Sequence, residues 1–459
     1  MFIVTALAST SQLASMQNSN SDSSSSPDPA RLSLLTPIGY QSSDCGYCKS
    51  EESSQRTPDS RASYYARAKV LGPEHYQKLM DRGWRRSGTL IYLPDASRSC
   101  CPHYTIKLPA SEFRPSRDQR QALHRWNKFV LGEKYIKEVE KQFPKTKEEK
   151  KRLKDTFDLE QVVHESGRPN LRPSIEPDHR FEVTLEPDKF TEEKFGLFEN
   201  YQRHVHHEED GDITASGFKR FLCSSPVSRQ TDSDGKKLGS FHQCYRLDGR
   251  LIAMAVLDLL PHAVSGVYFI YHSDFEKWSF GKLSALREAC LALEQGYQYY
   301  YMGYYIHGCK KMRYKGDYKP QYVLDYDSLQ WDPLNDDMKF LMEHSKYASM
   351  SRHRLKEAGS LPDEEDKPMH PTPTEAMQSG LSLLQLGMPG VLTLDQLHQE
   401  VELDHMKVHL GRGSVHEIQN ISTWDSGSDL DQSSLRGIFA ELAAVLGPDV
   451  AKEAIIDFG

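Results

Sequence analysis

The sequence lacks any run that approaches the ~20 apolar residues of a membrane-spanning helix, which excludes an integral helical membrane protein. Residues 2–8 are apolar, but the stretch is short and has no basic start. A secretory signal needs a charged segment there, and a transit peptide needs arginines. These absences predict a cytosolic or nuclear protein with no membrane partner.

The sequence also lacks a glycine-rich loop where one would matter for a nucleotide-like cofactor. The helix expected over residues 278–294 opens with Ser279-Phe280-Gly281-Lys282, which contains one glycine. A helix N-terminus favours phosphate, but acetyltransferase-type folds bind the coenzyme A pyrophosphate through a richer glycine loop. Coenzyme A is therefore a disfavoured cofactor.

Cysteine is scarce, with eight residues in 459, which does not suit a disulfide framework in a chain of this size. Cys45 and Cys48 form a Cys-x-x-Cys knuckle, and Cys100 and Cys101 follow 51 residues later. Four thiols close a tetrahedral zinc site or hold an iron–sulfur cluster, and His103 is a substitute ligand. Buried or free thiols are the alternative interpretation.

Charge is unevenly distributed along the chain. Residues 61–154 contain 23 Lys and Arg against 10 Asp and Glu, whereas residues 327–459 contain 10 against 23. An excess of this size steers a polyanion toward the basic part, although solvated helix surfaces produce the same pattern. The basic candidates on the helix expected over residues 116–131 are Arg117, Arg120, Arg125 and Lys128.

Composition and hydrophobic periodicity predict an α+β protein with two folded units. We expect a disordered Ser-rich leader over residues 1–38 and a Cys-rich basic α+β domain, clasped by metal, over residues 39–143. A charged, Pro-rich linker over residues 144–178 precedes a second α+β domain over residues 179–332. The acidic residues 333–459 are expected to form a partly disordered tail, with a docking helix as the alternative.

The domain of residues 179–332 is predicted to contain a sheet with one crossover helix. Strands expected over residues 240–247 and 250–259 are joined by Asp248-Gly249, a strong hairpin signal. A third strand, residues 264–272, precedes the helix of residues 278–294, in which apolar residues recur at helical spacing. The aromatic residues 299–304 then predict another strand.

A polar loop follows that aromatic strand, over residues 307–315. It contains Lys310, Lys311, Arg313 and Lys315. Arg313 is able to hold a carboxylate through two parallel hydrogen bonds, which Lys cannot do. A solvated basic loop is the alternative.

Several ordered motifs resemble those of eukaryotic arginyl-tRNA–protein transferases, across about residues 40–335. These motifs are Cys45-Gly46-Tyr47-Cys48, Trp84-Arg85-Arg86-Ser87-Gly88, Cys100-Cys101-Pro102, Ser240-Phe241-His242-Gln243, Leu283-Ser284-Ala285-Leu286-Arg287-Glu288, Tyr300-Tyr301-Met302-Gly303-Tyr304-Tyr305-Ile306-His307 and Tyr314-Lys315-Gly316. The resemblance implies an acetyltransferase-like (GNAT-type) catalytic domain and a zinc ion or iron–sulfur cluster on the four N-terminal cysteines.

The same resemblance implies an enzyme that transfers arginine from arginyl-tRNA to proteins that begin with Asp, Glu or oxidised Cys. The product is a degradation signal for the ubiquitin pathway. Two other enzymes stay open: a leucyl-type aminoacyl-tRNA–protein transferase and a coenzyme A-dependent N-acyltransferase. A non-catalytic RNA-binding protein is the third alternative.

Aminolysis of an activated ester needs mainly positioning and charge stabilisation. The catalytic candidates are Tyr304, His307 and His242. The candidates for binding the acceptor or the tRNA are Lys310, Lys311, Arg313, Lys315, Tyr305, Gln243, Arg85 and Arg86, and those for binding the arginine guanidinium are Asp258 and Glu288. Distantly related bacterial leucyl/phenylalanyl transferases carry Asp-x-Gln where this chain has Met302-Gly303-Tyr304, so this strand supplies no carboxylate base.

Overall fold

The computed structural model describes residues 32–48, 55–172, 174–360, 371–411, 414–424 and 427–458, apart from the side chains of residues 153 and 154. Most of the predicted leader lies outside these residues. Residues 34–38, however, belong to strand β1 (Leu34–Ser43) and not to a disordered segment. Within the described part of the chain, no helix is both long enough and apolar enough to cross a bilayer.

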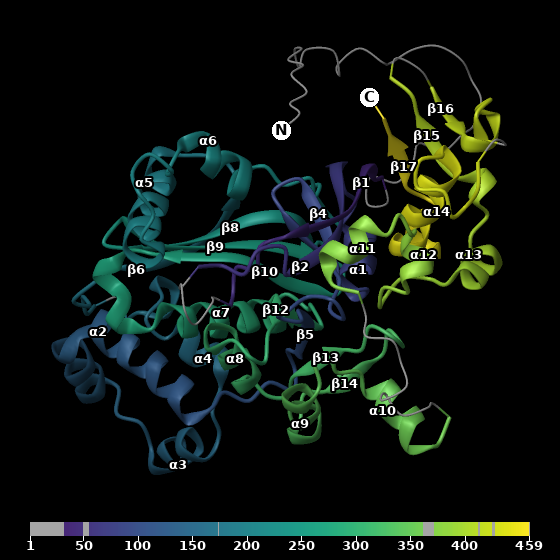
Figure 1. Ribbon diagram of the computed structural model, residues 1–459. Coiled ribbons are helices and arrows are strands. Elements are labelled where there is room, and N and C mark those ends of the chain that lie inside the picture. Colours follow the sequence, from purple (N-terminus) through teal and green to yellow (C-terminus); the bar gives the residue numbers. More distant parts are fainter. Residues whose placement is uncertain are drawn as a thin grey trace.

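The first sheet combines the two ends of the chain. Its strand order is β16 (Val415–Glu417), β15 (Lys407–His409), β17 (Ile455–Asp457), β1, β2 (Arg61–Val70), β4 (Leu90–Pro94) and β3 (Arg85–Ser87). β17 pairs in parallel with β1. Helix α1 (Pro73–Asp81) follows β2, with Pro at its first position, where the missing N–H costs nothing. The predicted N-terminal unit is thus completed by strands from the tail (Figure 1).

The second sheet is larger and carries the predicted crossover. Its main order is β14 (Trp331–Pro333), β13 (Tyr322–Leu324), β5 (Tyr104–Pro109), β11 (Tyr299–Tyr301), β10 (Ala263–Tyr271), β9 (Arg250–Leu260), β8 (Lys237–Leu247) and β6 (Phe181–Pro187), with β12 (Tyr304–Tyr305) on β5 and β7 (Gln230–Thr231) on β8. The β8–β9 hairpin turns at Asp248 and Gly249, both at positive φ. β10 runs parallel to β11, so the predicted strand–helix–strand crossover is confirmed.

The predicted strand over residues 299–304 is broken in the structure. β11 ends at Tyr301, and Gly303 takes φ 76°, a left-handed conformation that glycine adopts without steric cost. Tyr304 and Tyr305 then pair with Thr105 and Tyr104 of β5. The prediction of one continuous strand was wrong. It gave weight to the β propensity of the aromatic residues and did not consider that Gly303 allows the chain to leave the strand.

Helices cover both faces of the second sheet (Figure 1). On one face, α7 (Phe280–Glu294) packs on β10 and β11, and α2 (Arg117–Gln142) and α4 (Leu159–His164) pack on α7. On the other face, α5 (Glu192–Tyr201) packs on β9 and β10 beside α6 (Ala215–Phe218). The predicted linker, residues 144–178, therefore contains α3 (Lys147–Asp155) and a helix, α4, that contributes to the core.

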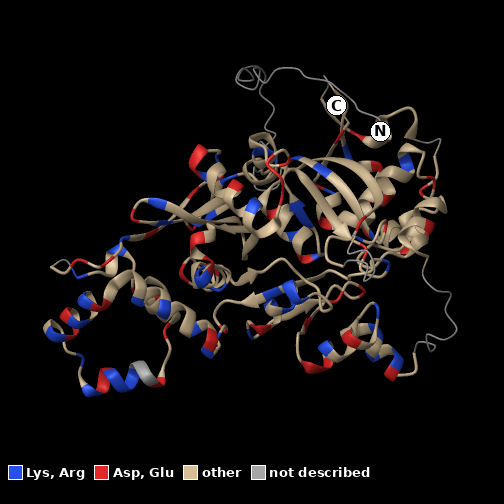
Figure 2. Cartoon of the chain, turned by 60° about the vertical axis from the view of Figure 1, so that its left-hand side comes forward, with Lys and Arg blue, Asp and Glu red and all other residues tan. Residues whose placement is uncertain are grey.

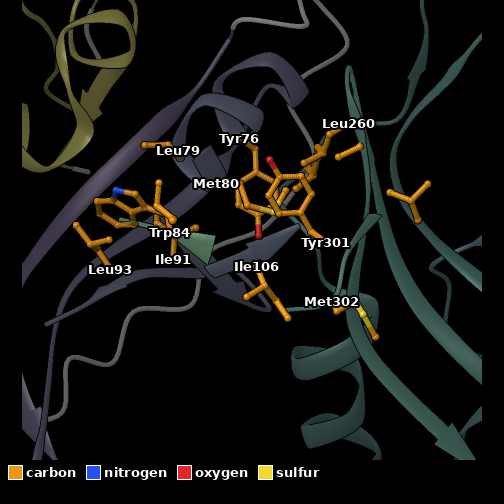
Figure 3. Close-up of a cluster of buried hydrophobic side chains, with 14 of the residues drawn as sticks. Tyr76, Leu79, Met80, Trp84, Ile91, Leu93, Ile106, Leu260, Tyr301 and Met302 are labelled. Atoms are coloured by element: carbon orange, nitrogen blue, oxygen red, sulfur yellow. The ribbon is translucent and has the colours of Figure 1, made fainter. Parts of the chain in front are cut away.

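The two predicted domains interlock through β5 and through a shared core. β5, from the predicted N-terminal domain, is a strand of the second sheet. Buried side chains of α1, β4 and β5, together with Trp84 just before β3, meet those of β9 and β11 in one cluster (Figure 3). Burying each large side chain there contributes about 1.5–3 kcal/mol to folding stability. This contact therefore holds strand β11 against the first sheet.

The tail is folded, which corrects the prediction of partial disorder for its described residues. It contains α9 (Asp336–His344), α10 (Met350–Glu357), α11 (Pro373–Gln378), α12 (Leu383–Leu386), α13 (Leu394–Glu400), α14 (Leu435–Leu446) and α15 (Pro448–Ala451). Most of α14 is buried, and the Trp84 indole donates to the Val445 carbonyl at 3.0 Å. The acidic composition of the whole segment predicted disorder, but its apolar residues are concentrated in α14, which is buried. Residues 361–370 lie outside the described part.

Candidate active site

The second sheet opens where β10 and β11 separate. Their last paired residues are Ser265 and Tyr301. A bulge between Gly266 and Tyr268 then bends β10, and the chain turns at Gly303 into β12. β10 and β11 form no further ladder pairs beyond this point, and we call this end of their ladder the opening.

Two cations lie at this opening. The Arg85 guanidinium stands over the rings of Tyr301 and Tyr304, at 5.6 and 5.2 Å from their centroids. The Lys315 ammonium donates to the Tyr304 carbonyl at 2.9 Å. Burial and the charge of Arg85 lower the pKa of Lys315 to about 7, so this side chain loses a proton near neutral pH.

These two cations have no anionic partner in the part of the chain that the structure describes. Nε and one terminal nitrogen of Arg85 are buried and make no hydrogen bond there, and neither Arg85 nor Lys315 forms an ion pair with a described residue. A buried donor without a partner costs about 1–3 kcal/mol. An arrangement that carries this cost fits a site that is completed by an anion.

Aromatic side chains line the same opening. The Tyr304 ring meets His103 edge-on, with ring centroids 5.3 Å apart, and the Tyr304 hydroxyl donates to the Gly83 carbonyl at 2.9 Å. Burial raises the pKa of Tyr304 well above its usual range. The proton of this hydroxyl is therefore committed to the main chain, and its catalytic role stays a prediction. We call Arg85, Lys315, Tyr301, Tyr304 and His103 the cation–aromatic cluster.

The four predicted metal-ligating cysteines converge next to this cluster. The sulfurs of Cys45, Cys48, Cys100 and Cys101 all lie within 4.8 Å of one another. Zn–S bonds of about 2.3 Å place tetrahedral thiolates roughly 3.8 Å apart, so the four residues fit a metal ion. His103, the predicted substitute ligand, is not in this group of converging atoms; its ring packs edge-on against Tyr304. Tyr47, inside the Cys-x-x-Cys knuckle, meets the other side of His103 at 5.1 Å, which joins the cysteines to the cation–aromatic cluster.

Arg86 and Asp258, both predicted to contact a substrate, form a buried ion pair with each other. Their side chains are 1% and 0% exposed, and Arg86 donates to both carboxylate oxygens of Asp258 at 2.6 and 2.7 Å. Arg86 therefore does not reach a tRNA phosphate, and Asp258 has no room for a substrate guanidinium. This pair joins β3 to β9. It could not be predicted from local sequence because its two residues are 172 positions apart.

Glu288, on α7, and Gln243, on β8, both make hydrogen bonds to neighbouring side chains. Glu288 is buried and accepts from the hydroxyls of Ser284 and Tyr300, the latter at 2.6 Å. Burial raises the pKa of Glu288 to about 7. Gln243 accepts from the Tyr245 hydroxyl at 2.7 Å. These contacts occupy both side chains with neighbours in the core, and the predicted binding roles stay untested.

His242 lies on the opposite face of the sheet, against the residues that follow α6. One ring nitrogen contacts the Leu222 carbonyl at 2.9 Å, and burial lowers the pKa of His242 to about 4. The imidazole is thus neutral at physiological pH. It lies outside the contacts that define the cation–aromatic cluster, and its catalytic role stays a prediction.

The loop after β12 forms a short helix, α8 (Lys310–Arg313), at the surface. Lys310, Lys311 and Arg313 are exposed, and Arg313 donates to the His307 carbonyl at 2.8 Å. His307 also contacts the Tyr305 hydroxyl at 2.8 Å. The structure therefore separates the predicted cationic set: Lys315 points inward and the other three stay in solvent.

Sequence reasoning missed the participation of Tyr301 and Tyr92. Tyr301 stacks under Arg85, and Tyr92 of β4 lies 6.2 Å from Tyr304 between ring centroids. The aromatic richness of both strands was visible, but it fits core packing equally well. Only their meeting at the seam between the two sheets distinguishes these residues.

Comparison with known proteins agrees with this geometry. Residues 43–121 match the model for "Arginine-tRNA-protein transferase, N terminus", and residues 193–325 match the model for its "C terminus". The arginyl-tRNA–protein transferase 1 of Drosophila melanogaster is 28% identical, over 70% of this chain and 86% of that protein. The protein of the same name from Saccharomyces cerevisiae is 33% identical over 56% of this chain, and the match spans half of the yeast protein's length.

A bacterial relative has a different name. The aspartate/glutamate leucyltransferase of Pseudomonas fluorescens strain Pf0-1 is 30% identical, over 57% of this chain and 83% of that protein. A solved structure of L-PGS from Bacillus licheniformis has a TM-score of 0.23 and 11% identity over 44% of this chain, which supports no assignment.

The interlocked α+β fold, the cysteine site and the cation–aromatic cluster thus belong to an enzyme of the aminoacyltransferase class. Within that class, the chain is a member of the arginyl-tRNA–protein transferase family.

Proposed function

We propose that this protein transfers arginine from arginyl-tRNA to the α-amine of proteins that begin with Asp or Glu, or with oxidised Cys. The product would be a degradation signal for the ubiquitin pathway. The observation that carries this proposal is a pair of cations, the buried Arg85 and the partly buried Lys315, without an anionic partner among the described residues. An acidic N-terminal side chain supplies the missing negative charge.

The proposed roles follow from this geometry. Arg85, held between two aromatic rings, presents its unpaired N–H groups to the acceptor carboxylate. Lys315 adds a second donor and, with a pKa of about 7, accepts a proton from the α-ammonium. This would supply the base that Met302-Gly303-Tyr304 lacks. Tyr304 positions Arg85 through its ring.

The basic α2–α3 region is proposed to contact the tRNA backbone. Arg117, Arg125 and Lys128 are exposed along α2. Figure 2 shows that Lys and Arg residues of α2 and α3 are interspersed with Asp and Glu. Individual contacts are therefore expected to be few, and binding to weaken with salt in proportion to them.

The cysteine site is proposed to hold one tetrahedral zinc ion. Four thiolates within 4.8 Å of one another suit a single ion, whereas a four-iron cluster would spread them, since each thiolate then binds a different iron. When bound, the ion would fix the Cys-x-x-Cys knuckle and thereby Tyr47 against His103. The fold of residues 179–332 is proposed to be acetyltransferase-like, on the support of the diverging β10–α7–β11 crossover.

Leucyl transfer is the second candidate, because a bacterial relative is named as a leucyltransferase. Single-turnover assays with arginyl-tRNA or leucyl-tRNA, and peptides that begin with Asp, Asn or Ala, separate the two. Arginine transfer to Asp but not to the neutral isostere Asn is expected. Arg85→Met should abolish the preference for Asp, while the exposed-site control Lys310→Met should retain it. Leucine transfer, or equal use of Asp and Asn, would contradict the proposal.

A further inference from the structure

A second group of metal-binding side chains lies away from the active site, on the α4–α7 contact. His164 is the last residue of α4, and Cys290 and Glu294 occupy one face of α7, four residues apart. The potential ligand atoms of these three residues lie within 4.8 Å of one another. The site mixes nitrogen, sulfur and oxygen, and nothing in the proposed chemistry uses it.

The distances come close to those of a coordinated ion. Nε2 of His164 lies 2.5 Å from Oε1 of Glu294 and 4.0 Å from Sγ of Cys290, and that sulfur lies 3.3 Å from the same oxygen. Zinc with tetrahedral N, S and O ligands needs separations of roughly 3.4–3.6 Å. Side-chain shifts of under about 1 Å therefore convert one arrangement into the other.

The main chain around these ligands is held in place. The His164 carbonyl accepts from the Gly167 amide and from the Asn170 side chain, both at 2.9 Å. Arg287 of α7 donates to the carbonyl of Val163 at 2.6 Å, which fixes the end of α4 against α7. Ligands on rigid elements bind an ion without ordering the chain first.

We infer that His164, Cys290 and Glu294 form a second metal site, which takes zinc or a similar divalent transition metal and fastens α4 to α7. Imidazole and thiolate ligands select these ions over Mg²⁺ and Ca²⁺. Three protein ligands leave the fourth position to water or to Glu160. Glu160 stands one turn before His164 on α4, with an exposed side chain.

The site gives the α4 segment a structural purpose. α4 belongs to the stretch between the two family matches, residues 122–192, and it packs on the helix that backs β11. The ion would hold this segment on α7 independently of the cysteine site. The inference does not rest on the proposed arginine transfer.

Metal counting on the full-length, reduced protein tests the inference. His164→Gln and Glu294→Gln change partly exposed side chains and should fold, whereas Cys290→Ser alters a buried residue. The matched control is Cys244→Ser, another buried cysteine outside both groups. After dialysis against zinc, elemental analysis should find one equivalent fewer in His164→Gln and Glu294→Gln than in the wild type and in Cys244→Ser.

Cobalt gives a second readout, which activity does not influence. Difference spectra of wild type minus His164→Gln should contain a thiolate-to-cobalt band, and cobalt affinity at this site should fall by roughly tenfold or more in the variant. Equal zinc content and equal cobalt spectra in wild type, His164→Gln and Glu294→Gln would overturn the inference. The four-cysteine site is present in all of these proteins and cancels in the comparison.

Discussion

The buried Arg86–Asp258 pair allows a sharp test of whether Arg86 supports the fold or binds RNA. Arg86→Met removes the guanidinium, which also donates to the Ser240 hydroxyl, and leaves the Asp258 carboxylate fully buried without its counter-charge. Removing one member of a buried ion pair costs about 3–5 kcal/mol of unfolding free energy, because the remaining charge is uncompensated. We expect a loss in that range.

The double variant Arg86→Met/Asp258→Leu should recover most of that loss. Replacing both charges with apolar side chains of similar volume is often neutral, so we expect the double variant to lie within about 2 kcal/mol of the wild type. Arg117→Met is the exposed control and should change the unfolding free energy by less than about 0.5 kcal/mol.

Two measurements are needed. Urea unfolding followed by circular dichroism gives the free energies, and tRNA binding at several salt concentrations gives the number of phosphate contacts. Arg86→Met should keep the wild-type salt slope, whereas loss of one phosphate contact lowers the slope by about 0.7–0.9. The reasoning is refuted if the double variant is as unstable as the single one, or if Arg86→Met stays stable but loses slope.

Three further predictions concern the active site. The pKa of Lys315 is lower in the folded chain, about 7, than the ~10.4 of an unfolded chain. The unfolded chain therefore binds more protons than the folded chain between these pH values. As pH rises from 7 to 10, the wild type should gain unfolding free energy relative to Lys315→Met. If the difference in urea midpoint between the two proteins is the same at pH 7 and at pH 9, this prediction is contradicted. Tyr304→Phe should cost about 1 kcal/mol through the lost bond to Gly83, yet keep the single-turnover rate within a few-fold, and a larger rate loss would show that the hydroxyl acts in catalysis. Cys48→Ser should remove one metal equivalent on elemental analysis and weaken acceptor discrimination, and an unchanged metal content would exclude the cysteine site.

Local signals predicted much of the fold. The Asp248-Gly249 hairpin, the apolar spacing along α7 and Pro73 at the start of α1 depend on neighbouring residues, and each was confirmed. The cysteine site was also predictable, because few arrangements other than a metal site explain two cysteine pairs in one basic unit. Their sulfurs converge across 51 residues.

Long-range pairings could not be predicted in the same way. Whether Arg86 faces solvent or Asp258 depends on how two sheets meet, and no local pattern encodes that contact. The sorting of Lys315 from Lys310 has the same origin, since it depends on how the turn that follows α8 places Lys315 against the Tyr304 carbonyl. The folded tail was missed because composition averages over residues that the structure separates into a buried α14 and an acidic surface.

The parallel pairing of β1 with β17 has a consequence for synthesis. β1 leaves the ribosome about 420 residues before its partner strand, which at roughly 5–20 residues per second is a delay of about 20–80 seconds. During that time one edge of β1 stays open and able to pair with other chains. Ribosome stalling or premature termination upstream of β17 would leave the first sheet unfinished, so incomplete chains should be marked by aggregation or by chaperone retention.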